Sequence, residues 1–201
     1  MIDRLINKCV SAMVQRGVIA DTEEQKEIYA YGLELKFYYI IHAALLLGIG
    51  ALAGRALEVA LLMFLFGLIQ SYGGGYHAET HKRCMAFMVL GVLAFLALYP
   101  VYLVHVMLQG ASVVLGLAIV LALAPIAHKN HPLSRPYSKK MGRKAKCIAC
   151  LIAGLWCILF FSGAWPAGRG IIAIVMLFSG VSMVCAQLKQ WGAFSFRRYR
   201  V

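Results

Sequence analysis

Six long apolar runs constrain this chain more than any other feature of its sequence. They cover residues 37–54, 56–69, 85–108, 111–127, 147–163 and 171–188. A membrane helix needs about 20 apolar residues to cross the hydrocarbon core of a bilayer, and most of the runs approach or exceed that length. Apolar residues make up 62% of the chain and charged residues 14%, which is typical of a polytopic membrane protein. We therefore predict an all-α integral membrane protein with six membrane helices.

The second run is the shortest, because residues 56–69 would rise only about 21 Å as a helix. Two alternatives stay open for the first two runs, which are joined at Gly54 and Arg55. Each run crosses the bilayer, or the two together form a re-entrant hairpin. Either arrangement returns the chain to the side from which it entered.

Basic residues predict which side of the membrane each connection occupies. Of the 20 Lys and Arg residues, 18 lie in residues 1–36, 70–84, 128–146 and 189–201. The opposite side keeps only Arg55 and Arg169. Because Lys and Arg near membrane ends are retained in the cytoplasm, we predict a multi-pass protein of a bacterial cell membrane with both termini and the 70–84 stretch in the cytoplasm.

Residues 1–36 are predicted to form an N-terminal helical region ahead of a membrane domain at 37–201. No cleavable signal peptide is apparent. The first 17 residues form an amphipathic pattern that ends at Gly17, with apolar positions Ile2, Leu5, Ile6, Cys9, Val10, Met13 and Val14. Such a helix lies in the inner leaflet or packs on the protein's own cytoplasmic loops, and both alternatives stay open. Asp21 and Glu24 resemble a capping box that opens a second helix.

One polar stretch, QSYGGGYHAETHKRC at residues 70–84, interrupts the apolar runs and carries two histidines and a cysteine. A thiol and an imidazole are the minimum set for nucleophilic acyl transfer. Cys84 directly follows Lys82 and Arg83, and nearby positive charge favours a reactive thiolate. The CxxC pair Cys147 and Cys150, together with Cys157 and Cys185, lies in apolar runs, and these four cysteines are expected to be structural.

The residues alone leave the partner of Cys84 open. On a continuous helix His81 would be its neighbour, whereas His77 would share the same face about 10.5 Å away. The glycines at 73–75 permit a sharp bend just before His77, so a continuous helix is not required there. A zinc site of the form His-x3-His-x2-Cys and an inert polar loop are further alternatives.

The charge distribution gives a clue about the binding partner. All eight acidic residues lie at or before Glu79, so the predicted loop 128–146 and the tail carry only basic charges. A topology signal with attraction to anionic lipid accounts for this excess, and an acidic peptide substrate is the sharper alternative. We do not expect nucleic acid as a partner, because no recognition motif accompanies the basic residues.

At these residues the chain resembles a known family. GGYHAETHKRC at 74–84, YGLE at 31–34 and APIAHKNHPLS at 124–134 are similar to patterns of the accessory gene regulator protein B family. Its members are membrane cysteine endopeptidases of bacterial quorum sensing. The likeness covers essentially the whole chain, and the His-x6-Cys core after paired glycines is its most specific part.

The resemblance implies a cofactor-free thiol protease with Cys84 as nucleophile and His77, rather than His81, as general base and acid. Its substrate would be a short propeptide with an amphipathic leader and an acidic C-terminal part. That part is removed, and the remainder is cyclised into a thiolactone or lactone through an acyl-thioester. Many family members carry Arg where this chain has Gln70, so the resemblance does not carry a charge-holding role over to this position.

Further expectations concern binding and assembly. Candidate substrate-binding or oxyanion residues are Gln70, Gly74, Gly75, Lys129, Lys139 and Lys140. Gly50 and Gly54 form a small-residue motif that, together with the resemblance, suggests a homodimer. A competing class is a non-enzymatic peptide transporter or exporter, for which Glu58 is nearly the only charged candidate within the apolar runs, and Arg55 is placed to pair with it.

Overall fold

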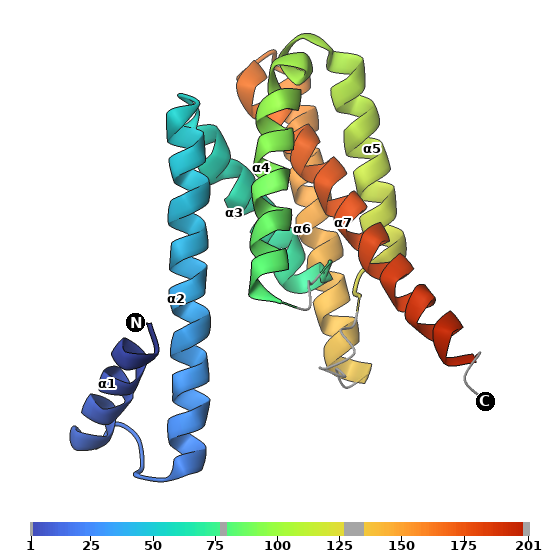
Figure 1. Ribbon diagram of the computed structural model, residues 1–201. Coiled ribbons are helices and arrows are strands. Elements are labelled where there is room, and N and C mark those ends of the chain that lie inside the picture. The colour runs from blue at the N-terminus through green and yellow to red at the C-terminus, as the bar shows by residue number, and fades with distance from the viewer. Residues whose placement is uncertain (1, 77–79, 127–134, 199–201) are drawn as a thin grey trace. The chain divides into compact units, whose positions relative to one another are not determined.

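In the computed structural model every element of regular secondary structure in the described part of the chain is a helix, which confirms the all-α class. It describes residues 2–76, 80–126 and 135–198, and only the backbone of residues 2–3, 81–82, 135–137 and 192–198. The helices are α1 (Ile2–Gln15), α2 (Glu23–Leu52), α3 (Ala56–Gly73), α4 (His81–Val104), α5 (Val106–Leu123), α6 (Arg135–Phe161) and α7 (Pro166–Arg198). Figure 1 shows them in chain order.

Six of these helices, α2 to α7, are long and apolar enough to cross a membrane, as the sequence predicts. The helix expected to be short, α3, runs to Gly73 and has 18 residues. Its length is therefore about 27 Å, close to the roughly 30 Å of a hydrocarbon core. The argument from length for a re-entrant hairpin no longer holds, because α2 and α3 are each long enough for a full crossing.

The predicted basic loop at 128–146 is wrong from residue 135 onward. α6 begins at Arg135 and continues through the whole basic segment into the apolar run. Lys and Arg are good helix formers, so a helix leaving the membrane continues through them at little cost. The basic residues of this segment are therefore arranged on a rigid helix.

Residues Met1–Gly48 form one compact unit. The apolar side of α1 contributes Ile6 and Val10 to a buried cluster with Ile19, against which Ala30, Leu33 and Phe37 of α2 pack. Of the two alternatives for this amphipathic face, the structure shows packing within the chain, on α2 rather than on a loop. The predicted stop at Gly17 is confirmed, because the Gly17 N–H donates to the Val14 carbonyl and the Val18 N–H to the Met13 carbonyl, each at 2.9 Å.

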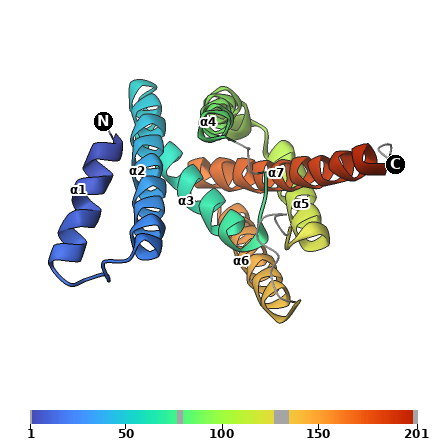
Figure 2. The ribbon, with the colours of Figure 1, turned by 60° about the horizontal axis from the view of Figure 1, so that its bottom comes forward.

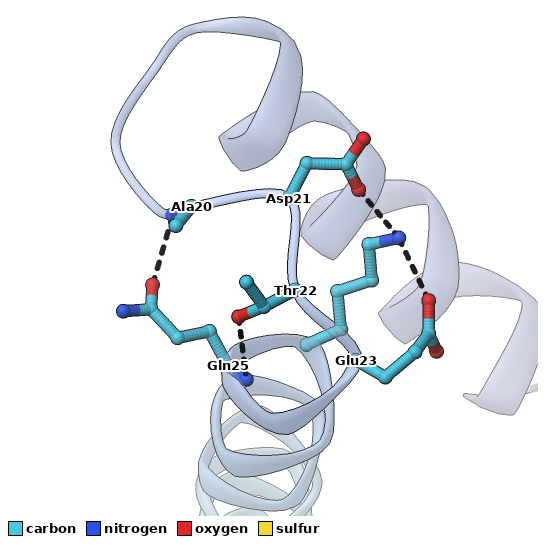
Figure 3. Close-up of polar contacts among 6 residues, drawn as sticks. Ala20, Asp21, Thr22, Glu23 and Gln25 are labelled. Atoms are coloured by element: carbon cyan, nitrogen blue, oxygen red, sulfur yellow. Dashed lines mark hydrogen bonds and ion pairs between the residues drawn. The ribbon is translucent and has the colours of Figure 1, made fainter.

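The cap of α2 differs from the predicted Asp21–Glu24 pair by one residue. Thr22 precedes the helix, and its Oγ1 accepts a hydrogen bond from the Gln25 N–H at 3.4 Å. The Gln25 Oε1 accepts from the Ala20 N–H at 2.8 Å (Figure 3). This Thr-x-x-Gln arrangement resembles a capping box, and it frees Asp21 for a different contact.

Lys26 joins Asp21 and Glu23 in this turn, with its Nζ 2.6 Å from the Asp21 carboxylate and 3.0 Å from that of Glu23. Hydrogen bonds to Asp21 and then Glu23 raise the pKa of Lys26. A raised lysine pKa stabilises the folded state at all pH values below the ordinary lysine range, and this stabilisation is lost as the pH rises through the raised pKa. The cap is therefore insensitive to pH near neutrality.

Residues Ile49–Val201 form the second unit, a bundle with α7 at its centre. α7 contacts α3, α4, α5 and α6, and 61% of its membrane segment is buried, against 22–28% for those four helices. Figures 1 and 2 show α7 running between α4 on one side and α5 and α6 on the other. The helix that comes last in the chain thus holds the bundle together.

α5 and α7 cross at very close range. A Cβ atom added to Gly116 of α5 would overlap the backbone carbonyl of Met176 in α7, and the Cα of Gly116 would lie 3.3 Å from a Cβ added to Gly180. Helices in lipid associate largely through such close backbone approach, because lipid tails are as apolar as the side chains. The two glycines therefore fix where α7 crosses α5.

Around the turn between α2 and α3 lie Gly50, which is predicted to permit close helix contact, and the predicted pair of Arg55 and Glu58. A Cβ on Gly50 would lie 2.9 Å from the Cβ and Cγ2 of Val59, so the close contact that Gly50 permits lies within the chain. The Arg55 guanidinium is 3.1 Å from the Glu58 carboxylate, which confirms the expected pair. The homodimer stays a prediction.

Candidate active site

The connection between α3 and α4 contains the residues that the sequence selects for chemistry. Because α3 ends at Gly73 and α4 begins at His81, the 70–84 stretch is helical at both ends. These two helix ends lie at the same end of the bundle as the end of α5 and the beginning of α6 (Figure 1). Contacts from distant parts of the sequence therefore converge on the short segment between them.

Cys84 lies in the first turn of α4 as a free, half-buried thiol. Thr80 caps this turn: its Oγ1 accepts a hydrogen bond from the Arg83 N–H at 3.3 Å, and its carbonyl accepts one from the Cys84 N–H at 3.0 Å. The amino end of a helix carries a partial positive charge, which attracts a thiolate. The first turn of α4 is therefore a favourable position for a nucleophilic thiolate.

Several predicted residues lie outside the described part of the chain. These are His77, Glu79 and Lys129, together with the side chain of His81. The predicted contact between His77 and Cys84 therefore stays a prediction. Among the side chains that are described, no group of three potential metal ligands occurs, but the proposed zinc ligands include His77 and His81, so that alternative also stays open.

The segment 124–126, which follows α5, packs directly against the end of α3. The Ile126 N–H donates to the Gly73 carbonyl at 2.9 Å, and a Cβ on Gly74 would lie 2.5 Å from the Ile126 carbonyl oxygen. Pro125, preceded by a cis peptide bond, lies against α6, where a Cβ on Gly142 would be 2.5 Å from its Cδ. Two of the three sequence patterns that carry the family resemblance thus meet in space.

α7 contributes residues that sequence reasoning missed. The Tyr76 N–H donates to Ser182 Oγ at 3.0 Å, and the Lys189 ammonium lies 5.5 Å from the centre of the Tyr76 ring. A Cβ on Gly73 would overlap the Met183 methyl group. A serine in an apolar run was the only available signal for Ser182, and Lys189 was counted only as a topology marker. Nothing in the sequence showed which face of α7 turns toward the site.

Gln70 and Gly75, both predicted as substrate-binding or oxyanion residues, lie next to one another, and their predicted roles stay predictions. A Cβ on Gly75 would overlap Gln70 Oε1 and would lie 2.7 Å from Ser182 Oγ, so a glycine is needed for this close packing. The Gln70 Nε2 is buried and has no hydrogen-bond partner among the described residues. A buried amide without a partner is costly, so this group is a candidate to meet a substrate oxygen.

Lys139 and Lys140 are exposed near the beginning of α6, so both are open to solvent. Arg143 and Lys144 follow them, and α6 carries no acidic residue. The Lys144 ammonium lies 5.2 Å from the centre of the Tyr72 ring, which is one residue before Gly73. This contact connects the basic helix to the candidate site.

Comparisons with known proteins agree with this picture. The model of the family described as accessory gene regulator B matches residues 6–189. An AgrB-like protein of Clostridium perfringens strain SM101 is 27% identical over 203 residues, which cover 96% of this chain and 93% of the relative. AgrB-like protein 2 of C. perfringens strain 13 is 27% identical over 202 residues, with 93% and 91% covered. No solved structure matches significantly. The family resemblance is thereby confirmed.

Proposed function

The chain belongs to the accessory gene regulator B family and is a multi-pass membrane protein of the agr quorum-sensing system, and from this we propose that it is a cysteine endopeptidase. It removes the acidic C-terminal part of a propeptide and closes the remainder into a thiolactone or lactone. The observation that carries this proposal is the free, half-buried thiol of Cys84 in the capped first turn of α4.

The reaction begins with attack of the Cys84 sulfur on a propeptide carbonyl carbon. His77 takes the thiol proton and delivers it to the departing amine, so the peptide C–N bond breaks as the C–S bond of an acyl-thioester forms. A thiol or hydroxyl within the retained peptide then attacks this thioester, and Cys84 recovers its proton. With an internal cysteine, one thioester replaces another, so no large free-energy input is needed beyond holding the chain ends together.

The oxyanion of this reaction needs hydrogen-bond donors. The Gly74 N–H, one of the predicted donors, already donates to the Gln70 carbonyl at 3.0 Å and is therefore engaged in the helix cap. The Nε2 of Gln70, which has no hydrogen-bond partner among the described residues, is the better candidate, because its N–H groups can donate to an oxyanion. We accordingly assign this role to the Gln70 side chain rather than to Gly74.

The acidic part of the propeptide is the natural partner of the basic helix surface. Lys139 and Lys140 are exposed on α6, and Lys129 is predicted to extend the same positive region. With both termini and the site in the cytoplasm, these charges would attract the acidic segment from the same compartment in which the propeptide is synthesised.

The structure does not favour the transporter alternative at Glu58, the charged residue that was named as its candidate. Glu58 pairs with Arg55 at 3.1 Å, and the Arg55 guanidinium also lies 4.8 Å from the centre of the Tyr99 ring. A carboxylate already neutralised by a neighbour three residues away has a structural role that accounts for its presence.

The test is to co-express the chain with a C-terminally tagged propeptide that has an amphipathic leader and an acidic C-terminal part, and to follow release of the tag. Cys84→Ala and His77→Ala should each abolish cleavage. Cys150→Ala, an exposed thiol of α6, and His105→Ala, an exposed imidazole after α4, are matched controls that should cleave normally. Normal processing by either active-site variant would overturn the proposal.

A further inference from the structure

One face of α7 touches the segment that leads into the proposed catalytic histidine. Ser182, Met183 and Lys189 each contact residues between Gly73 and Tyr76. Positions 182, 186 and 189 recur at helical spacing, and Ala186 between them is also buried. Residues 73–76 therefore pack against the C-terminal half of α7.

Ser182 makes the most specific of these contacts. It is 3% exposed, and its Oγ accepts the hydrogen bond from the Tyr76 N–H at 3.0 Å. Ser179, one turn earlier on the same helix, is fully buried, yet its Oγ has no hydrogen-bond partner among the described residues. Two buried serines of one helix thus differ in the property that matters, which is whether the hydroxyl holds the backbone of another segment.

Tyr76 is also held from the opposite side. Its ring lies 5.0 Å from the ring of Phe87, centre to centre, and Phe87 follows Cys84 by one helical turn on α4. The residue directly before His77 is thereby joined to α7 through its backbone and to the helix of Cys84 through its side chain. The backbone position of Tyr76 determines where the chain enters position 77.

We propose that Ser182 is a positioning residue of the active site. By accepting the Tyr76 N–H, its hydroxyl fixes the point from which His77 departs and so sets the approach of the imidazole to Cys84. This inference rests on the proposed function, because it assigns to Ser182 an effect that acts through His77. It adds a residue from the last helix to a site that the sequence locates only at 70–84.

The experiment compares Ser182→Ala with Ser179→Ala in the full-length protein in membranes. The probe is iodoacetamide, and the quantity measured is the rate of Cys84 alkylation as a function of pH. An imidazolium near a thiolate keeps the thiolate reactive at lower pH, so His77→Ala should move the midpoint of this profile upward. Ser182→Ala should move it in the same direction, and Ser179→Ala should leave it at the wild-type position.

Propeptide cleavage supplies the second measurement. Ser182→Ala should lower kcat between about tenfold and a hundredfold, the range expected when a reacting group is displaced by roughly 1 Å, with little change in KM. Ser179→Ala should leave both constants unchanged. A profile and a kcat for Ser182→Ala that match those of Ser179→Ala would overturn the positioning role.

Failure of this proposal is distinguishable from failure of the proposed function. If His77→Ala changes neither the alkylation profile nor cleavage, the proposed chemistry itself is wrong. If His77→Ala changes both while Ser182→Ala changes neither, only the role of Ser182 is refuted. A loss of folded Ser182→Ala protein with an unshifted alkylation midpoint in the remaining folded fraction would show a merely structural serine and would also refute it.

Discussion

The two halves of α7 use the same helix for different purposes. In the N-terminal half, residues 171–176 are all at most 2% exposed, and the backbone approaches α5 at Gly116. In the C-terminal half, Ser182 and Lys189 contact the segment before the proposed catalytic histidine. The N-terminal half packs within the helix bundle, and the C-terminal half contacts the candidate active site.

The difference lies in the kind of contact that each half makes. Lipid offers no hydrophobic advantage for helix association, so the N-terminal half depends on shape, with glycines that let backbones touch. The C-terminal half adds polar contacts, which are directional and can therefore position a neighbouring segment. Substitutions in the two halves should accordingly separate folding from catalysis.

The largest effect is expected at the crossing of α5 and α7. Gly116→Ala places a methyl group against the Met176 carbonyl, a backbone atom that cannot move by itself. Overpacking of this kind costs about 1–3 kcal/mol, so the thermal midpoint of the detergent-solubilised protein and its yield should both fall. Gly91→Ala, which meets open space in α4, is the control and should leave the midpoint unchanged or slightly raised. Equal midpoints for the two variants would contradict the packing role.

A large effect on activity with a smaller effect on folding is expected at Gly74. Its φ of +71° lies in the left-handed region, which costs a residue with a side chain about 1–2 kcal/mol, and the added methyl would also press on the Ile126 carbonyl. Cleavage of the propeptide by Gly74→Ala should fall about tenfold or more. Gly67→Ala, in the helix that Gly74 follows, meets open space and should cleave normally. A wild-type kcat for Gly74→Ala would show that this turn does not affect the site.

An intermediate effect is expected where α6 meets the 124–126 segment. Gly142→Ala would bring a methyl group 2.5 Å from the Pro125 ring. The ring cannot rotate away as an acyclic side chain can, so the segment that carries Pro125 has to shift. Displacement of this segment should lower kcat by about threefold to tenfold, because it also carries the Ile126 contact to Gly73. Steady-state cleavage assays with Gly154→Ala of the same helix as control would test this. A loss of stability without any loss of kcat would assign Gly142 to the fold alone.

The smallest effect is expected at Glu58, which lies in the first turn of α3, at the opposite end of that helix from Gly73. Its partner Arg55 lies over the Tyr99 ring, which in turn packs near Gly170 at the beginning of α7. Glu58→Gln should lower stability by about 0.5–1 kcal/mol, the range of a partly exposed ion pair, and leave cleavage unchanged. Thermal melts and tag release measured on the same preparation would test both parts. Reduced cleavage at unchanged stability would revive a role for this carboxylate in peptide passage.

The sequence located some elements well and others with errors that have physical causes. The α3 boundary was set at residue 69 because hydropathy ends there, whereas the helix continues through Gln70 to Gly73. The beginning of α6 was missed for the same reason, since charged residues end an apolar run without ending a helix. The cap of α2 was displaced by one residue, because Asp21 and Thr22 are both good capping residues and only the backbone decides between them.

The sequence by itself determined that this is a helical membrane protein of the accessory gene regulator B family and that Cys84 is the candidate nucleophile. A membrane-spanning segment is predicted from its composition, and a motif is recognised from the order of neighbouring residues. Both features can therefore be found in the sequence without knowing the tertiary structure. Only the tertiary structure decided that Ser182 meets Tyr76 and that the 124–126 segment meets Gly73. In lipid every apolar face is equally well solvated, so the hydropathy pattern carries no information about which side of α7 turns inward.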